Sequence, residues 1–314
     1  MNSEQDLINY LKRFKTYDKK IITGIGDDCS IIKFSSNKKY VFTTDTSLLG
    51  PHFSKDYSPE EIGYKTLATN ISDIASMGCK PLYAMYALTL PKMSEAWIKK
   101  FFKGTKGLLN KYKMSIIGGD TTKGPLSVTI QLVGVQNKKI LTRGGAKLGD
   151  DIYVTGTIGG ARAALISKKQ TEAYKYFRKY LVRPQPRVQI GLELSRFANS
   201  CIDVSDGLAK DLKNISIASK KGFEIHIDLI PTCAKFNNFV SDKKKEECLL
   251  GGGEDYELCF TANKKYTNNI NNISKLSKTK ITKIGTITHS KYKFYENKKL
   301  YTVKTRGYDH FQCK

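Results

Sequence analysis

The sequence predicts a protein of two domains, each built from helices and strands in an α/β or α+β arrangement. Its 314 residues exceed the roughly 100–200 residues typical of one domain. Segments with strand and helix periodicity alternate along the chain, as they do in both fold classes. A turn rich in glycine and aspartate near residue 149 interrupts this alternation, and the pattern restarts after it. We therefore expect domains at residues 1–149 and 150–314.

The clearest helix signal in the first domain lies between residues 58 and 77. Ser58 and Glu61 have the spacing of a capping box, and Pro59 occupies the first helical position. Gly78 follows the last periodic residue and is typical of a helix end. The remaining elements expected in this domain are helices at 3–16 and 94–112 and strands at 39–43, 82–90, 114–117 and 126–135.

The second domain repeats this alternation of strands and helices. Its expected strands lie at 151–155, 201–204, 223–228, 256–261 and 281–287, and its expected helices at 160–166, 171–181, 187–198 and 207–219. The periodicity does not distinguish a parallel sheet from a mixed one. Residues 262–300 are rich in lysine and asparagine, so we expect this region to lie at the periphery.

The charge of the chain is strongly positive and first suggests an anionic partner. Lysine and arginine number 53 against 29 aspartate and glutamate residues, which gives a formal charge of +24. Such an excess is common in proteins that bind nucleic acid or an anionic surface. A simpler interpretation is a lysine-rich composition that is spread over solvated faces. The two interpretations differ in where the charges lie along the chain.

Composition also indicates a protein of the cytoplasm. No apolar run approaches the ~18 residues of a membrane-spanning helix. The first six residues lack the basic and apolar regions of a secretory signal. The seven cysteines are odd in number and include no CxxC pair, which favours reduced thiols over disulfides or a zinc site.

Acidic residues recur beside glycines at the ends of predicted strands and helices. A single one would most often be a turn or cap residue. As a set they suggest a site for magnesium and a nucleotide, because glycine lets the backbone approach phosphate and Mg²⁺ bridges carboxylates to phosphate oxygens. The acids concerned are Asp27, Asp28, Asp45, Asp73, Asp120, Asp203, Asp206, Glu254 and Asp255.

Several common catalytic motifs are missing from the sequence. It contains no G-x-x-x-x-G-K-[ST] motif, which argues against a P-loop enzyme, and no H-R-D or D-F-G, which argues against a protein kinase. It also lacks the H-E-x-x-H of many zinc hydrolases and the G-x-S-x-G elbow of serine hydrolases. A nucleotide enzyme with this sequence must therefore use another fold.

The order of the motifs resembles the thiamine-monophosphate kinase family from about residue 24 to 311. The motifs are GDD at 26–28, TTDT at 43–46, HF at 52–53, NISDIASMG at 70–78, GGDT at 118–121, LTRGGA at 141–146, DVSDGL at 203–208, GGEDYEL at 252–258 and GYDHF at 307–311. The resemblance implies the two-domain architecture of aminoimidazole ribonucleotide synthase, with mixed sheets and flanking helices. It further implies a homodimer in which the N-terminal domains pair and ATP lies at their interface.

The activity implied is transfer of the ATP γ-phosphoryl group to the phosphate of thiamine phosphate, the last step of thiamine diphosphate synthesis. Residues 1–149 would bind ATP and Mg²⁺ and form the dimer, and residues 150–314 would complete the active site. Several Mg²⁺ ions would be held by Asp28, Thr43, Thr44, Asp45, Asp73, Asp120, Asp203 and Asp206. ATP would contact Tyr112, Gly119, Asp120, Arg143 and Ser205, and thiamine phosphate would contact His52, Glu254 and Tyr308.

The residues expected to carry catalysis are Asp45, Asp73, Asp120, Arg143 and Asp206. Transfer between two anions requires positioning and charge neutralisation more than covalent chemistry. The acids would therefore hold metal ions, and Arg143 would neutralise phosphate charge. No covalent nucleophile is expected, because the acceptor phosphate oxygen is already ionised.

Two alternative functions remain open at this point. One is another ATP-dependent enzyme of the same superfamily that acts on a purine precursor. The other is a nucleic-acid-binding protein that uses the +24 charge. The lysine pairs and runs are scattered along the chain without interleaved aromatics, and no nucleic-acid-binding motif is recognisable, so we expect no nucleic-acid partner and no membrane partner.

Overall fold

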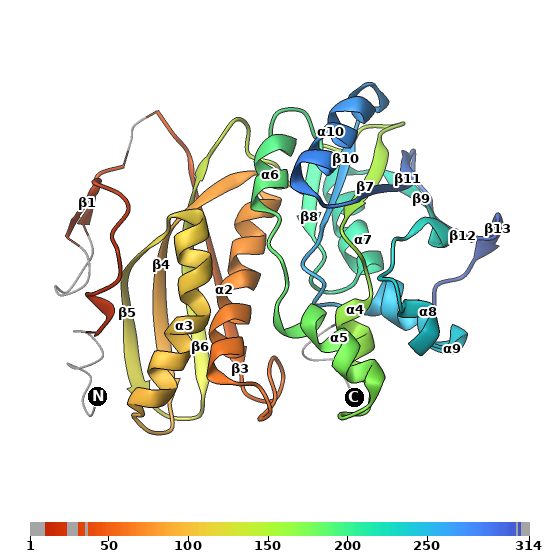
Figure 1. Ribbon diagram of the computed structural model, residues 1–314. Helices are drawn as coiled ribbons and strands as arrows, with labels where there is room; N and C mark the ends of the chain where they lie inside the picture. Colours follow the sequence, from red (N-terminus) through yellow and green to blue (C-terminus); the bar gives the residue numbers. More distant parts are fainter. Residues whose placement is uncertain (1–9, 24–30, 35–36, 306, 309–314) are drawn as a thin grey trace. The chain divides into compact units, whose positions relative to one another are not determined.

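The computed structural model describes residues 10–23, 31–34, 37–305 and 307–308 (Figure 1). The chain divides into two compact units. The first contains Met1–Ile74 and Cys79–Asn137, and the second contains Ala75–Gly78 and Lys138–Lys314. The division expected at residue 149 therefore falls inside the second unit. Backbone hydrogen bonds attach residues 138–150 there, from Lys139 N–H to Ser195 O and from Cys201 N–H to Thr142 O.

The first unit is built on a four-stranded mixed sheet with the order β3-β6-β4-β5. Strands β4 and β5 are parallel, and the other neighbours are antiparallel. The strands are β3 (Tyr40–Leu48), β4 (Cys79–Leu90), β5 (Ser115–Lys123) and β6 (Ser127–Gln136), with helices α2 (Pro59–Ser76) and α3 (Glu95–Tyr112). Two short strands, β1 (Ile21–Thr23) and β2 (Ile31–Ile32), form a separate pair.

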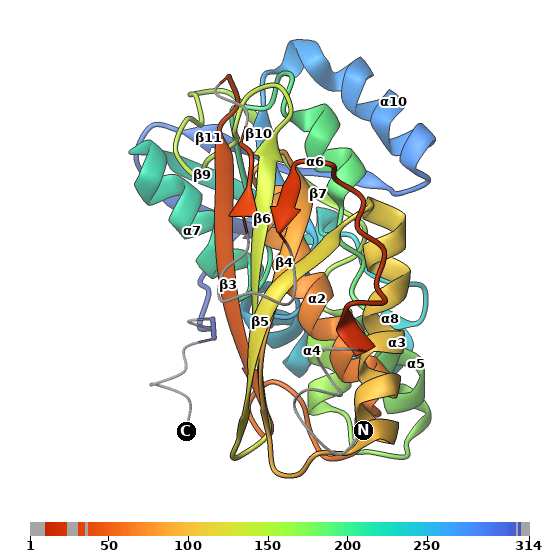
Figure 2. The ribbon, with the colours of Figure 1, turned by 90° about the vertical axis from the view of Figure 1, so that its left-hand side faces the viewer.

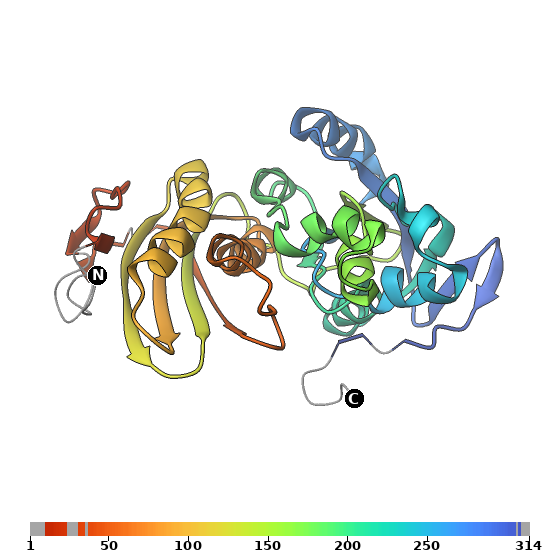
Figure 3. The same cartoon turned by 60° about the horizontal axis from the view of Figure 1, so that its bottom comes forward.

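Both helices lie on one face of this sheet (Figures 2 and 3). On that face Tyr86 of β4 makes edge contacts with Phe101 and Phe102 of α3. The opposite face is covered at one end, where Ile21 packs against a small apolar cluster. Elsewhere on this face several of the described side chains are exposed, and Phe42 of β3 is 61% exposed. We call this second side the open sheet face.

Local capping explains why both helices begin where the sequence predicts. The Ser58 N–H donates to Glu61 Oε2 at 2.8 Å, and the Glu61 N–H donates to Ser58 Oγ at 3.2 Å, so the capping box before α2 is formed. Ser94 caps α3 by accepting the Trp97 N–H at 3.4 Å. These helices and the strands around them confirm the expected mixture of helix and strand.

The second unit contains a seven-stranded mixed sheet with the order β13-β12-β9-β11-β7-β10-β8. The strands are β7 (Asp151–Thr155), β8 (Ser200–Asp203), β9 (Gly222–His226), β10 (Leu258–Ala262), β11 (Ile281–Thr288), β12 (Tyr292–Glu296) and β13 (Lys299–Tyr301). The helices are α4 (Gly160–Ile166), α5 (Glu172–Val182), α6 (Val188–Leu194), α7 (Leu208–Ser219), α8 (Phe236–Phe239), α9 (Asp242–Glu246) and α10 (Thr267–Ser277).

The expectation that residues 262–300 are peripheral is wrong for much of this segment. Strand β11 pairs with β7 on one side and β9 on the other, inside the sheet. Helix α10 places Ile270 and Ile273 in the core cluster with residues of α6, β7 and β10. The lysines and asparagines occupy exposed positions of these elements, so average composition concealed their buried face.

Several predicted boundaries differ from the observed ones. Strand β3 continues to Leu48 and β5 continues to Lys123, so Asp45 and Asp120 lie within strands rather than at their ends. The helix expected at 3–16 is helical only at residues 10–11 of its described part. The helix expected at 187–198 ends at Leu194, and shortly after it the Arg196 and Phe197 N–H groups donate to carbonyls three residues earlier, Glu193 O and Leu194 O.

Two further expectations concern the membrane and the cysteines. Among the described residues, none of the helices combines the length and the apolar character needed to cross a membrane. Five cysteines are buried and form no disulfide, namely Cys79, Cys201, Cys233, Cys248 and Cys259. Burial raises the pKa of the Cys79 thiol to about 11, so this group stays a thiol at neutral pH.

Candidate functional site

The first group of predicted site residues lies where β3 faces α2. The Thr43 hydroxyl donates a 2.6 Å hydrogen bond to Asp73 Oδ2. Asp45 follows two residues later, so its side chain projects from the same face of β3 as Thr43. Helix α2 thus brings Asp73 to the side of the sheet on which Thr43 and Asp45 lie. Asp28, the other metal ligand expected near the N-terminus, lies outside the described residues.

Thr44 and Asp120 belong to the open sheet face instead. Residues that pair across neighbouring strands project from the same face of a sheet. Across the four strands, Asp120 of β5 lies in register with Ala87 of β4, Thr129 of β6 and Thr46 of β3, so all four project from the open sheet face. Asp45 belongs to the alternate set, which faces the helices. Strands β3 and β5 are also three strand spacings apart, or about 14 Å. Within one chain, Asp45 and Asp120 therefore lie apart and project from opposite faces of the sheet.

The loop after β3 fixes the ring of His52. The Leu48 N–H donates to His52 Nδ1 at 3.1 Å, and the His52 N–H donates back to Leu48 O at 3.2 Å. The buried Lys65 donates from Nζ to His52 O at 3.0 Å. Because Nδ1 accepts a hydrogen bond, the proton of the neutral imidazole is on Nε2. This arrangement suits a side chain that donates to an anion.

Gly119 and Tyr112, two predicted ATP contacts, occupy different parts of the first unit. A Cβ atom at Gly119 would collide with the Tyr86 carbonyl, so only glycine fits between β5 and β4 at this point. Tyr112 is the last residue of α3, and Lys111 Nζ lies 5.1 Å from the centre of its ring. Tyr112, at the end of α3, lies near Ser115, the first residue of β5. Asp120 lies five residues further along β5, about 16 Å from Ser115, so Tyr112 and Asp120 are well separated.

In the second unit, the loop after β8 carries Asp203, Ser205 and Asp206. Asp203 is the last residue of β8 and is buried. The N–H groups of Ser205 and Asp206 both donate to Asp211 Oδ2 at 3.1 Å. Burial raises the pKa of Asp211 to about 7. The first turn of α7 therefore holds this loop through a carboxyl group that the sequence did not single out.

A strained glycine loop places Glu254 beside Ser205. The backbone φ angles of Glu254 and Tyr256 are 75° and 50°, a left-handed region that costs energy for residues other than glycine. The Glu254 N–H donates to Ser205 O at 2.9 Å. A Cβ atom at Gly253 would overlap that same carbonyl, which explains the glycine. The structure thus brings Glu254 and Ser205 together, as expected for one binding site.

The C-terminal segment packs against the same loop. The Tyr308 N–H donates to Asp206 O at 2.9 Å, and Lys210 Nζ donates to Tyr308 O at 2.5 Å. Lys210 also forms an ion pair with Asp206 Oδ2 at 2.8 Å. Hence Tyr308, Asp206 and Glu254, three predicted site residues far apart in sequence, meet within the second unit.

A single carboxylate, Glu246, anchors this C-terminal segment. It accepts hydrogen bonds from the Tyr301 hydroxyl at 2.6 Å, the Lys304 N–H at 2.7 Å and the Thr305 N–H at 2.8 Å. These partners lower the pKa of Glu246 despite partial burial. We refer to the described residues of this segment, 301–305 and 307–308, as the C-terminal strap.

Arg143 does not join the group around Asp206. Its carbonyl accepts a hydrogen bond from Ser219 Oγ at 3.1 Å, at the last residue of α7. Ser205 and Asp206 are bound at the first turn of the same helix. Twelve helical residues span about 18 Å, more than an arginine side chain can reach. Within one chain, Arg143 and Asp206 therefore do not meet at one phosphate group.

The sequence reasoning missed three residues that shape this site, namely Asp211, Lys210 and Glu246. Asp211 had a readable signal, because an acid in the first turn of a helix often binds nearby N–H groups. Glu246 had none, since its partners lie 55 to 59 residues further along the chain. Only the fold brings such groups together.

The donor groups near β3 and α2 are compatible with magnesium. Mg²⁺ prefers hard oxygen ligands and is usually bound by one or two carboxylates, completed by water and substrate phosphates. Asp45, Asp73 and the Thr43 hydroxyl offer only oxygen atoms. In the part of the chain that the structure describes, no three His, Cys, Asp or Glu side chains already cluster as a complete metal site. The residues thus fit an ion that substrate phosphates help to hold.

Comparison with known proteins first shows the class of protein to which the chain belongs. Residues 26–136 match the family model described as AIR synthase related protein, N-terminal domain. This is the class that the mixed sheet and its glycine-flanked carboxylates define. The chain is 38% identical over 319 residues to the thiamine-monophosphate kinase of Buchnera aphidicola subsp. Schizaphis graminum, covering 99% of each chain. The chain belongs to the thiamine-monophosphate kinase family.

Solved structures agree with this assignment. The crystal structure of thiamine-monophosphate kinase from Stenotrophomonas maltophilia K279a superposes with a TM-score of 0.84 at 35% identity, covering 94% of this chain and 96% of that one. The structure of AaThiL complexed with AMPPCP and TMP superposes with a TM-score of 0.78 at 29% identity, covering 98% and 96%. The expected aminoimidazole ribonucleotide synthase-like architecture is confirmed.

Proposed function

We propose that this chain transfers the γ-phosphoryl group of ATP directly to the phosphate of thiamine phosphate, giving thiamine diphosphate and ADP. As a member of its family it is an ATP-dependent phosphotransferase that acts on thiamine phosphate. The observation that carries the direct transfer is the convergence of Glu254, Asp206 and Tyr308 in the second unit. In this arrangement the Glu254 carboxylate and the Tyr308 ring would bind the rings of thiamine phosphate, of which the thiazolium is cationic. None of these side chains is a covalent nucleophile.

The Mg²⁺ ions would be held in the first unit by Asp45 and Asp73, with Thr43 orienting Asp73 through its hydrogen bond. Asp28 would add a ligand in this unit, Thr44 and Asp120 would bind ions on its open sheet face, and Asp203 and Asp206 would do so in the second unit. When bound, the ions would neutralise phosphate charge and let two anions approach. His52 would donate from Nε2 to the phosphate of thiamine phosphate. Arg143, Gly119, Tyr112 and Ser205 would bind ATP.

The active form that we propose is a homodimer. Asp120 lies on the open sheet face, about 14 Å from Asp45 and on the other side of the sheet. A second copy packed on that face would bring its own Thr44 and Asp120 beside those of the first copy, so that both copies would contribute residues to one interface. The open sheet face also carries exposed apolar side chains, among them Phe42 and Leu48. We further propose a cytoplasmic location, which the five buried thiols support.

The test is a substrate panel with ATP and Mg²⁺, read out as ADP and as the phosphorylated product. We expect thiamine diphosphate to form only when ATP, Mg²⁺ and thiamine phosphate are all present. Excess EDTA should abolish turnover and added Mg²⁺ should restore it. Activity on a purine precursor in place of thiamine phosphate, or full activity in EDTA, would overturn the proposal.

A further inference from the structure

One lysine in the second unit contacts two parts of the proposed active site at once. Lys210 Nζ forms an ion pair with Asp206 Oδ2 at 2.8 Å and donates a hydrogen bond to Tyr308 O at 2.5 Å. Asp206 is a proposed metal ligand, and Tyr308 is a proposed substrate contact. A carboxylate oxygen that is suited to a metal ion therefore has an ammonium group beside it.

The C-terminal strap holds this ammonium group in place. The strap crosses directly over the stem of Lys210, because a Cβ atom at Gly307 would lie only 2.8 Å from Lys210 Cβ and 3.0 Å from its Cδ. Gly307 has a φ angle of 79°, which also favours glycine. The next residue, Tyr308, donates its N–H to Asp206 O at 2.9 Å. A surface lysine loses side-chain entropy when it forms an ion pair, whereas the strap already restricts Lys210 at its stem and at its ammonium group.

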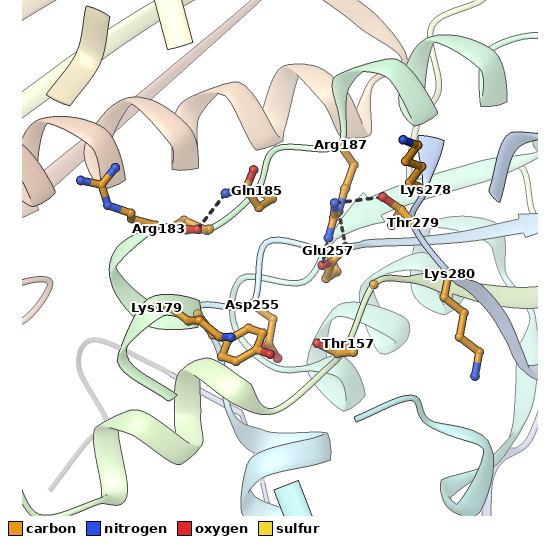
Figure 4. A pocket seen from close by; sticks show the side chains of 13 residues that line it. Thr157, Lys179, Arg183, Gln185, Arg187, Asp255, Glu257, Lys278, Thr279 and Lys280 are labelled. Carbon is orange, nitrogen blue, oxygen red and sulfur yellow. Dashed lines mark hydrogen bonds and ion pairs between the residues drawn. The ribbon is translucent and has the colours of Figure 1, made fainter. Parts of the chain in front are cut away.

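Another ion pair of the second unit has the properties of a permanent structural pair. Arg187 donates to both carboxylate oxygens of Glu257, at 2.7 Å from Nε and 2.5 Å from Nη2, and to Thr279 at 3.2 Å (Figure 4). The Arg187 and Glu257 side chains are only 19% and 8% exposed. Lys210 instead offers a single ammonium group, and the Lys210 and Asp206 side chains are 33% and 38% exposed. Ions from solvent can therefore reach Asp206 and exchange with its partner.

This geometry sets two cations in competition for one carboxylate. A metal ion that binds Asp206 Oδ2 must displace the ammonium group, and an ion that binds the other oxygen must approach a fixed positive charge. We propose that Lys210 is a tethered competitor of the metal ion at Asp206, which rests on the part of the proposed function that makes Asp206 a metal ligand. An ion that substrate phosphates help to hold has further ligands, so it displaces the lysine more easily than a bare ion does.

The test measures binding of Mn²⁺, used in place of Mg²⁺, to the full chain without nucleotide or thiamine phosphate, from the electron paramagnetic resonance signal of the free ion. Lys210→Met removes the charge but keeps an apolar stem under Gly307, and we expect it to bind one Mn²⁺ about tenfold more tightly than the wild type. Lys210→Arg keeps the charge and should bind Mn²⁺ no more tightly than the wild type. Lys213→Met removes an exposed lysine of the same helix, α7, and is the matched control, with an affinity within about twofold of wild type.

A double-mutant cycle assigns the effect to Asp206. In the Asp206→Asn background the carboxylate is absent, so Lys210→Met should change the affinity for Mn²⁺ by less than about twofold. An affinity of Lys210→Met that is equal to or below that of the wild type, or a gain that persists in Asp206→Asn, would overturn the proposal. A lysine with only a structural role would change the unfolding temperature in EDTA and leave the affinity for Mn²⁺ unaltered. Since no turnover is measured, this proposal can fail while the wild-type chain still forms thiamine diphosphate from ATP and thiamine phosphate.

Discussion

Asp73 is the residue on which the proposed metal chemistry depends most directly. Asp73→Asn removes the negative charge but keeps a side chain that can accept the 2.6 Å hydrogen bond from Thr43. We expect kcat for ADP formation with thiamine phosphate to fall by about 100-fold or more. The free energy of unfolding should change by less than about 1 kcal/mol. Glu95→Gln, an exposed change on α3, is the control and should leave both quantities unaltered.

Asp255 makes stability depend on pH in a direction that its burial fixes. Its pKa is about 8 in the folded chain, mainly because of burial, and about 4 in an unfolded one. Its contribution to the free energy of unfolding is therefore complete below about pH 4 and is lost as the pH rises to about 8. Asp255→Asn lacks this loss, while its amide oxygen can still accept the Gly159 N–H.

The measurement is chemical unfolding of both proteins at several pH values. Between about pH 5 and pH 8, the difference in free energy of unfolding should move in favour of Asp255→Asn by on the order of 4 kcal/mol. Asp242→Asn is the control, because this exposed acid on α9 has a pKa lowered by Lys245. Parallel pH profiles for the wild type and Asp255→Asn would contradict the prediction.

At the scale of elements, Glu246 holds the first part of the C-terminal strap, and Asp206 and Lys210 hold Tyr308 at its end. Glu246→Ala removes the acceptor of three hydrogen bonds and should loosen residues 301–305 and, through them, the position of Tyr308. We expect KM for thiamine phosphate to rise about tenfold, with kcat and KM for ATP within about twofold of wild type. Asp242→Ala on the same helix is the control. A fall in kcat without a change in either KM would show that the strap does not position substrate.

Elements were predictable from sequence where local signals decide them. The capping box of Ser58 and Glu61 and the cap at Ser94 fixed the starts of α2 and α3. Predicted boundaries were wrong where strand pairing determines them, because a strand continues for as long as a neighbouring strand offers hydrogen bonds. Strand β3 thus runs on to Leu48 beside β6, and Asp120 lies inside β5 rather than at its end. The strand order and the position of β11 also depend on long-range pairing.

The sequence predicted which residues belong to the candidate site, but it did not predict how they are arranged in space. Motif order identified Glu254, Asp206 and Tyr308, and the fold brings them together. The same reasoning grouped Asp45 with Asp120 and Arg143 with Asp206, which the sheet faces and the length of α7 keep apart within one chain. Spacing along a chain does not report which face of a sheet a side chain leaves. At the scale of the whole molecule, the open sheet face with its exposed Phe42 and Leu48 is the surface through which we propose that two copies pair.

A substitution at Phe42 tests the proposed homodimer. Its ring is 61% exposed on the open sheet face, so Phe42→Asp should leave the folded monomer stable. In a dimer that buries this face, an unpaired carboxylate would be costly, and we expect the variant to become monomeric in sedimentation experiments. We expect kcat to fall by at least about 100-fold along with it. Leu276→Asp, at an 85% exposed position of α10, is the control and should change neither mass nor turnover. A wild-type chain that is monomeric at concentrations where it is fully active would contradict the prediction.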